Sequence, residues 1–413
     1  MHRNGKELQS ICESFMKNTM GFYDIPGISA GVYCSGFHWT AAAGCRNYKS
    51  GAPVMKDTVF HCTSVSKLFT ACGIMKLVEE GRLTLSDRAE EILPYLSIAD
   101  KRWKDMTIKS MMTHTSGLSD VADYGWQKHR TADNVLKEYV LSEEVSGRRL
   151  LWSPHENKFR YSNVGYDLLG LVIAEISGMT FEEFMKKEIF EPLCMNDTTF
   201  LTADRFSQMV GRETDSGECE NSIDCELFLA AADEAGLAMP HRKNRDRSIS
   251  PVEVYPYTRQ HAPSSTITST TGDMMKWAGN LIETYSNWRR QRDVELRRKG
   301  EEGDLGKTYG DVLLRGESID MMWTIRNDIP GESEKMALGW FAKELHVKAA
   351  KYDDDEKSFL VVGHEGSDEG FRTSLWICPR MEAAVVLMCN MTDAPLGRLS
   401  SELLKALVRW EAR

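Results

Sequence analysis

The sequence predicts an α+β fold, in which an antiparallel sheet is flanked by helices and a mostly helical domain is inserted into it. Strand patterns occur only near the two ends of the chain, within 28–43 and 337–389. Helical patterns dominate the middle, from about 84 to 201. A chain of 413 residues has room for one large domain with such an insertion, or for two domains.

The strand patterns place the sheet in both ends of the chain. Residues 28–34 and 39–43 are apolar runs joined by a turn at Ser35-Gly36, as in a hairpin. We therefore expect a discontinuous sheet domain at 1–85 and 258–413, and an inserted helical domain at 86–257. The later strands are expected at 337–341, 359–362, 371–377 and 383–389.

The helical patterns have recognisable ends. Gly81 follows the apolar segment 66–80 and Gly178 follows 164–177, and glycine is a common helix stop. Between about 204 and 257 the chain is polar and irregular, which predicts a long surface excursion within the inserted domain. Further helices are expected at 7–23, 181–189, 271–285 and 400–412, with a charged linker at 289–306.

Composition limits the classes of partner. The formal net charge is −10, and an acidic surface repels phosphate backbones, so no nucleic acid partner is expected. No apolar run reaches the roughly 18 residues of a membrane span, and the first residues lack an apolar signal core. We therefore expect a cytoplasmic protein that does not bind a membrane. The oligomeric state is not predicted.

The ten cysteines are expected to be reduced. Most lie in apolar stretches, as small buried hydrophobic residues do. No pair has the CxxC spacing of a zinc or redox site, although a bridge between Cys219 and Cys225 is an alternative. Because no metalloprotease, phosphate-loop or dinucleotide motif stands in a fitting context, no metal or cofactor is expected.

The first candidate catalytic element is Ser64-Val65-Ser66-Lys67. A serine hydroxyl is a poor nucleophile at neutral pH and needs a base nearby. A lysine three residues later lies on the same helix face, and burial would lower its pKa enough to accept the hydroxyl proton. By itself the tetrapeptide is more often a helix-capping serine with a surface lysine. Its apolar surroundings indicate a buried helix instead.

Two further elements occur in loops. In Tyr161-Ser162-Asn163, a phenol can transfer protons and an amide can orient a substrate; the alternative is a turn that caps the next helix. In His364-Glu365-Gly366-Ser367, we expect Gly366 to let a substrate approach an edge strand. The backbone N–H of Ser367 would then join that of Ser64 in an oxyanion hole. The alternative is a glycine-containing hairpin turn with a surface histidine.

The three elements in this order resemble the serine β-lactamase and penicillin-binding-protein superfamily. The similar branch contains class C β-lactamases, DD-peptidases, D-aminopeptidases and family VIII-type carboxylesterases, which carry SxxK, YxN and then KTG or HxG. The resemblance covers about 8 to 410, except for the 204–257 excursion. Supporting stretches are Ile25–Gly27, Leu77–Asp87, Ser269–Met274 and, most closely, Met111–Leu118.

This resemblance implies a β-lactamase-like fold and a serine hydrolase that forms an acyl-enzyme on Ser64. Lys67 and Tyr161 would share the proton transfers, and the residues leave open which of them is the acylation base. The substrate would be a small ester, amide or peptide, positioned by Asn163, His364, Gly366 and Ser367. The alternatives are a β-lactamase proper or penicillin-binding protein, and a non-catalytic binding protein on the same fold.

Two details refine this expectation. His364 stands where the lactamases of this branch have a lysine, and a neutral histidine is a weaker anchor for a carboxylate, so we expect uncharged substrates to be preferred over β-lactams. Gly27-Ile28-Ser29-Ala30-Gly31 fits the GxSxG pattern of α/β-hydrolases. That motif needs a sharp turn from strand to helix, whereas this segment reads as a continuous strand.

Overall fold

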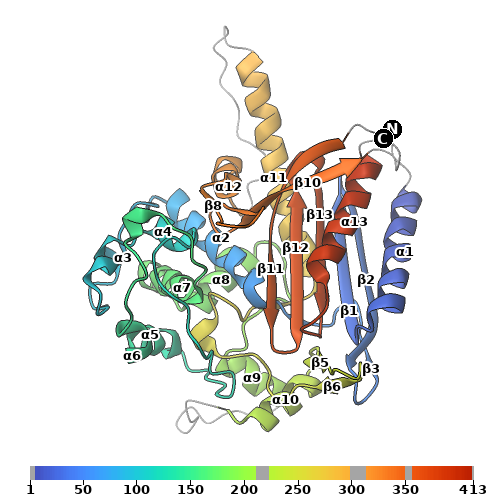
Figure 1. Cartoon of the computed structure of the whole chain (residues 1–413), viewed down its shortest axis with the longest axis horizontal. Coiled ribbons are helices and arrows are strands. Elements are labelled where there is room, and N and C mark those ends of the chain that lie inside the picture. The colour runs from blue at the N-terminus through green and yellow to red at the C-terminus, as the bar shows by residue number, and fades with distance from the viewer. Residues whose placement is uncertain (1–4, 211–222, 298–312, 349–355, 412–413) are drawn as a thin grey trace.

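A nine-stranded antiparallel sheet forms the centre of the molecule (Figure 1). The computed structural model describes residues 5–210, 223–297, 313–348 and 356–411. The strand order is β3-β2-β1-β13-β12-β11-β10-β9-β8, so β1 from the N-terminal part lies beside β13 from the C-terminal part. This mixed arrangement confirms the predicted α+β class. The strands are β1 (Gly27–Cys34), β2 (Phe37–Asn47), β3 (Ala52–Pro53), β8 (Asn327–Asp328), β9 (Lys335–Met336), β10 (Phe341–Lys348), β11 (Glu356–Asp368), β12 (Phe371–Cys378) and β13 (Ala383–Cys389).

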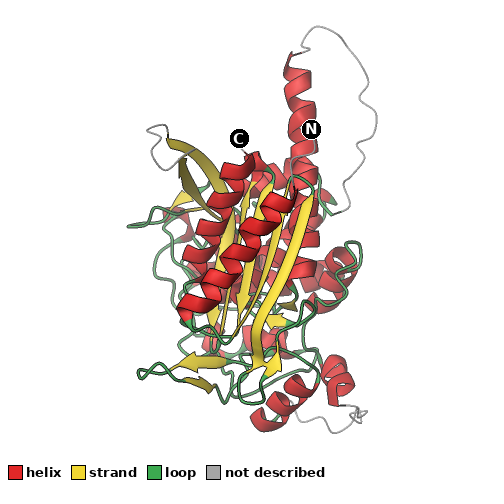
Figure 2. Cartoon of the chain, turned by 90° about the vertical axis from the view of Figure 1, so that its right-hand side faces the viewer, coloured by secondary structure: helices red, strands yellow, loops and turns green. Residues whose placement is uncertain are grey.

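Helices cover both faces of this sheet. On one face lie α1 (Gly5–Tyr23) and α13 (Leu396–Glu411), side by side (Figure 2). On the other face lies α11 (Thr271–Arg297), which packs against β1 and β13. The central strands are therefore buried on both faces, and every residue of β1 and β13 is buried. Alternate side chains of β13 enter the two cores: Val385 and Leu387 face α13, whereas Val386 and Met388 face the other side.

The mostly helical part lies to the left of the sheet in Figure 1 and contains a buried central helix, α7 (Asn163–Ser177). Ser162 caps α7 by accepting a hydrogen bond from the N–H of Gly165, and Gly178 ends it at a φ of 73°. α7 contacts α2 (Ser66–Glu79), the helix that follows Ser64. The other helices of this part are α3 (Ala89–Ile92), α4 (Ile108–Met112), α5 (Val135–Leu141), α6 (Glu143–Ser146), α8 (Phe181–Met185), α9 (Ala203–Val210) and α10 (Cys225–Glu234). The domain boundaries at 85/86 and 257/258 remain predictions.

Three segments differ from the sequence-based expectation. The strand expected at 337–341 starts only at Phe341, and 337–340 is a buried loop. α11 continues to Arg297, where a linker was expected from 289. The described parts of 204–257 contain α9, α10 and a small hairpin of β5 (His241–Lys243) and β6 (Ile249–Pro251). The remaining helix, α12 (Gly316–Trp323), packs on α11.

Within the described ranges, no single helix combines the length and hydropathy needed to cross a membrane. α7 reaches these values only together with residues 181–190, and the two helices meet at a bend of 78°. Buried core helices have the same composition.

Candidate active site

Ser64 lies in a 3₁₀ turn, Thr63–Val65, directly before α2. The backbone at Thr63 has a φ of 52°, a left-handed conformation that a β-branched residue rarely adopts. The turn is anchored by Ser66, whose hydroxyl donates to the carbonyl of Thr63 at 2.7 Å and accepts from the N–H of Ile267 at 3.1 Å. Ser64 is partly exposed at this turn, so its hydroxyl can be reached from solvent.

Lys67 is fully buried one helical turn from Ser64. Its Nζ lies 3.3 Å from Ser64 Oγ and 2.6 Å from the carbonyl oxygen of Ser264, and it also donates to Asn163 Oδ1. Burial lowers the pKa of Lys67 to about 8, against the opposing effect of nearby carboxylates, Asp120 first. The amine is therefore close to deprotonation at neutral pH.

Tyr161 stands over the lysine, with the Lys67 ammonium 4.9 Å from the centre of its ring. Burial raises the pKa of Tyr161 well above its usual value, although a hydrogen bond with Ser64 opposes this. The ring packs on His114, with the two ring centres 4.4 Å apart. Nδ1 of His114 accepts a hydrogen bond from the N–H of Ser162, which fixes the loop that carries Tyr161.

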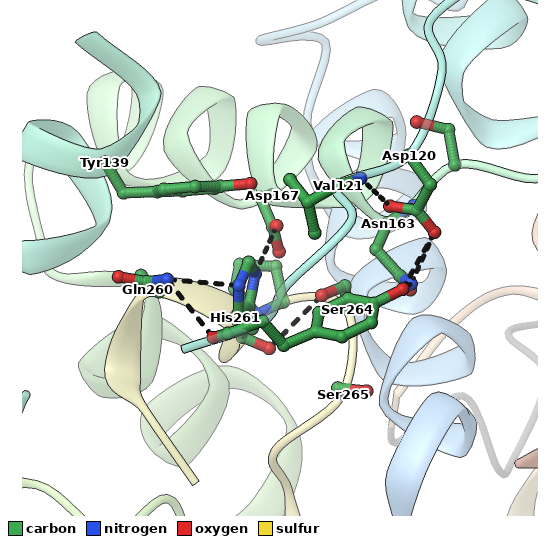
Figure 3. A network of polar contacts seen from close by, with 12 residues as sticks. Asp120, Val121, Tyr139, Asn163, Asp167, Gln260, His261, Ser264 and Ser265 are labelled. Atoms are coloured by element: carbon green, nitrogen blue, oxygen red, sulfur yellow. Dashed lines mark hydrogen bonds and ion pairs between the residues drawn. The ribbon is translucent and has the colours of Figure 1, made fainter. Parts of the chain in front are cut away.

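Asn163 is oriented by a carboxylate behind it (Figure 3). Its Nδ2 donates to Asp120 Oδ2 at 2.9 Å and to the hydroxyl of Tyr124 at 2.6 Å. The N–H of Asn163 also donates to Asp120. These bonds assign Nδ2 as the donor, so Oδ1 points to Lys67 as an acceptor.

A second carboxylate lies behind Lys67 on the next turn of α7. Asp167 and His261 are both fully buried, and Nδ1 of His261 lies 2.8 Å from Asp167 Oδ2 (Figure 3). Gln260 Nε2 lies 3.1 Å from the other nitrogen of His261, so both ring nitrogens have a polar partner. Ser264, which accepts from Lys67 through its backbone carbonyl, donates through its hydroxyl to the backbone carbonyl of His261 at 3.3 Å.

The third predicted element lies on β11, directly beside Ser64. A Cβ added to Gly366 would lie 1.7 Å from Thr63 Oγ1 and 2.6 Å from Ser64 N. The space in the direction of a Cβ at Gly366 is therefore filled by the turn of the nucleophile, and the expected role of Gly366 in substrate approach stays a prediction. β11 is also an interior strand, between β12 and β10. It has a free edge only beyond Gly363, where its pairing with β10 ends at Phe341.

His364 and Glu365 point to opposite faces of the sheet, as alternation requires. His364 is buried beside Tyr161, with ring centres 6.1 Å apart, and burial lowers its pKa to about 3, so the ring is neutral. Its Nδ1 contacts the carbonyl of Glu365 at 2.5 Å, and its Nε2 has no partner among the described residues. Glu365 accepts from Trp376 Nε1 at 3.3 Å on the α13 side. Ser367 is exposed, and only its backbone can serve the site.

The structure thus brings all seven sequence-predicted residues to one place and keeps the other serine motif apart. Ser29 is buried in the middle of β1, where its hydroxyl pairs with that of Thr271 at 2.8 Å, so GxSxG is not a nucleophile elbow here. Sequence reasoning missed five residues that build the site, because each acts on a partner far along the chain. These are His114, Asp120, Asp167, His261 and Ser264. His114 lies in the stretch 111–118, whose similarity to the family is the one signal that points to any of the five.

Comparison with known proteins decides the family. The family model described as Beta-lactamase matches residues 12–408, nearly the whole described chain. The chain belongs to the beta-lactamase family. This is a family of serine hydrolases, and the resemblance expected from the three motifs is confirmed.

Individual members of the family show how far the likeness extends. Penicillin-binding protein 4* of Bacillus subtilis is 35% identical over 150 residues, which are 35% of this chain and 31% of that protein. The chain thus matches less than half the length of this relative. A penicillin-binding protein homologue from Pyrococcus abyssi has a TM-score of 0.70 at 22% identity, covering 98% of this chain and 78% of the other. A D-stereospecific amidohydrolase from Streptomyces has a TM-score of 0.64 at 18% identity, covering 96% and 98%. These structures confirm the β-lactamase-like fold.

Proposed function

We propose that this beta-lactamase family member cleaves an ester or amide bond through an acyl-enzyme on Ser64. The observation that carries the proposal is the 3.3 Å contact between Ser64 Oγ and the buried Lys67 Nζ, whose pKa lies near 8. A neutral amine at this distance can accept the hydroxyl proton as the oxygen attacks the substrate carbonyl.

The remaining steps use the groups around this pair. The oxygen of the tetrahedral intermediate takes its negative charge between the N–H groups of Ser64 and Ser367. Tyr161 is protonated in the free enzyme, because burial raises its pKa, so we assign it the transfer of a proton to the leaving group and Lys67 the role of acylation base. A water molecule then attacks the acyl carbonyl and gives one proton to Tyr161. As the bond to the acyl group breaks, Lys67 returns its proton to Ser64 Oγ, and both groups regain their starting state.

The same geometry supports a preference for substrates without a carboxylate on the leaving-group side. His364 is neutral and buried, and its N–H is on Nδ1, where it donates to the carbonyl of Glu365. Nε2 can therefore only accept a hydrogen bond, where a lysine would supply a full positive charge. Charge-assisted hydrogen bonds are roughly twice as strong as neutral ones. We therefore propose esters or amides as substrates ahead of penicillins and cephalosporins. The likeness to a D-stereospecific amidohydrolase is compatible with this choice.

Intact-mass analysis with a fluorophosphonate probe, short-chain esters, amides and nitrocefin tests the proposal. The wild type should gain one acyl or phosphonyl group, and Ser64→Ala should gain none while it keeps its thermal transition. Ser29→Ala is the matched control, because it also removes a serine hydroxyl and should label like the wild type. Labelling that persists in Ser64→Ala, or a wild type that none of the reagents acylates, would refute the mechanism. In the second case a binding protein on this fold would be the better description.

A further inference from the structure

The carboxylate of Asp368 lies on the catalytic face of β11. His364, Gly366 and Asp368 share this face by alternation, and Gly366 touches the turn of Ser64. Asp368 is two residues further on, about 7 Å along the strand. Its side chain is 11% exposed, and it is close enough to raise the pKa of the Lys67 amine.

One oxygen of this carboxylate accepts hydrogen bonds from the protein, and the other accepts none from the described residues. Asp368 Oδ2 lies 2.8 Å from His61 Nε2 and 3.2 Å from the hydroxyl of Ser265. Across the described residues, Oδ1 makes no hydrogen bond, and it is not among the fully buried polar atoms. The side chain is therefore fixed in direction and keeps one acceptor oxygen for a group that enters from solvent.

The side chains that hold Asp368 leave it without a lysine or arginine partner among the described residues. His61 is fully buried, and its Nδ1 has no partner within the described part of the chain. Nε2 is therefore the nitrogen through which His61 donates to Asp368. Both groups that hold Asp368 donate to the same oxygen, Oδ2. No lysine or arginine of the described ranges forms an ion pair with it.

We propose that Asp368 is a binding subsite for a protonated amine on the acyl part of the substrate. The inference rests on the proposed acyl-enzyme and narrows its substrates to aminoacyl esters or amides. Ser367, whose N–H would hold the acyl oxygen together with that of Ser64, directly precedes Asp368 in β11. The open oxygen of Asp368 would therefore be the acceptor for an ammonium on the acyl α-carbon or on the next carbon.

A matched pair of substrates isolates the amine. Alanine benzyl ester, as each enantiomer, and benzyl propionate differ only in the α-amino group, and benzyl alcohol release gives kcat/KM for both. In the wild type, kcat/KM should be higher for one enantiomer of the alanine ester than for benzyl propionate. Asp368→Asn keeps the shape and the acceptor for His61. Because any effect through Lys67 acts on both substrates alike, the variant should lower the ratio of kcat/KM for the alanine ester to kcat/KM for the propionate about 10- to 100-fold.

Two variants separate binding from general effects. Glu369→Gln removes the same charge from the next residue, which is exposed, and should leave the ratio of the two substrates unchanged. Asp368→Glu keeps the charge and should retain part of the preference. An equal loss for both substrates in Asp368→Asn, or a wild type without preference, overturns the subsite. If the wild type is acylated by neither ester at Ser64, the proposed function itself fails.

Discussion

The amine of Lys67 is buried between two carboxylates that reach it through polar groups. Asn163 connects it to Asp120, and Ser264 connects it through His261 to Asp167. Burial raises the pKa of Asp167, and the attraction of His261 and of Lys67 opposes this rise, so the charges of Asp167 and Lys67 act on each other. Desolvation favours the neutral amine and these charges favour the ammonium. The balance holds the lysine near the pH at which a base works best.

Removing one of these charges should shift the pH dependence of acylation in a known direction. In the wild type, acylation by an uncharged ester should rise with pH and be half-maximal near the Lys67 pKa of about 8, because the base must be neutral. Asp167→Asn keeps the hydrogen bond to His261 but removes a charge that raises this pKa. The alkaline rise should therefore move to lower pH.

Stopped-flow acylation rates as a function of pH measure this shift, and an exposed charge provides the control. Asp123→Asn removes a carboxylate from the loop after Asp120 and should leave the midpoint in place. A midpoint that stays or rises in Asp167→Asn would show that Asp167 does not act on the lysine.

The contact between β11 and the turn before α2 aligns the nucleophile with the sheet. Two elements from opposite parts of the chain meet at Gly366 and Thr63 without room for a side-chain carbon. The positive φ of Thr63 shows that the turn is already strained, so little further adjustment is open to it.

Gly366→Ala should consequently impair catalysis through geometry. The new Cβ would overlap Thr63 Oγ1 and press on the backbone of Ser64, so strand and turn must separate. A displacement of about 1 Å can cost about 100-fold in rate, and we expect kcat/KM to fall at least that far. Gly272→Ala, where the nearest atom is 3.6 Å away, should keep normal activity. An active Gly366→Ala variant would mean that this contact does not set the alignment.

The elements themselves could largely be predicted from periodicity, whereas their contacts could not. α2, α7 and β13 carry continuous apolar patterns, and the structure has them within a residue of the expected bounds. The error at 337–340 has a physical cause, since this segment is apolar because it packs on α2: a Cβ at Gly339 would lie 2.5 Å from that of Ala71. Asp368 contacts His61 at a sequence separation of 307 residues, and Asp167 contacts His261 at a separation of 94. Local sequence patterns cannot predict contacts at such separations.

At the scale of the molecule, the sheet separates two hydrophobic cores with different tasks. The core under α1 and α13 contains none of the catalytic side chains, whereas the core around α2, α7 and α11 surrounds Lys67. Stability can therefore be changed on one face with little effect on the chemistry of the other.

A pair of leucine substitutions tests this separation. Leu404→Ala, fully buried on α13, should lower the free energy of unfolding by about 2–5 kcal/mol and leave kcat/KM unchanged below the transition. Leu168→Ala, equally buried on α7, should cost similar stability and also reduce activity, because α7 carries Asn163. Denaturant titration and steady-state kinetics on both variants give the comparison. Equal activity loss in the two would show that the cores are coupled through the sheet.

The strand order also fixes when activity can first arise. β1 needs β13 as its second neighbour in the sheet, and the turn of Ser64 packs against β11. Residues that are synthesised early therefore contact residues that are synthesised last. At about 5–20 residues per second, a ribosome needs many seconds to travel from His61 to its partner Asp368, 307 residues later. During that interval the nascent chain carries Ser64 without the strand that packs against its turn. The complete site can therefore form only after the C-terminal strands have left the ribosome.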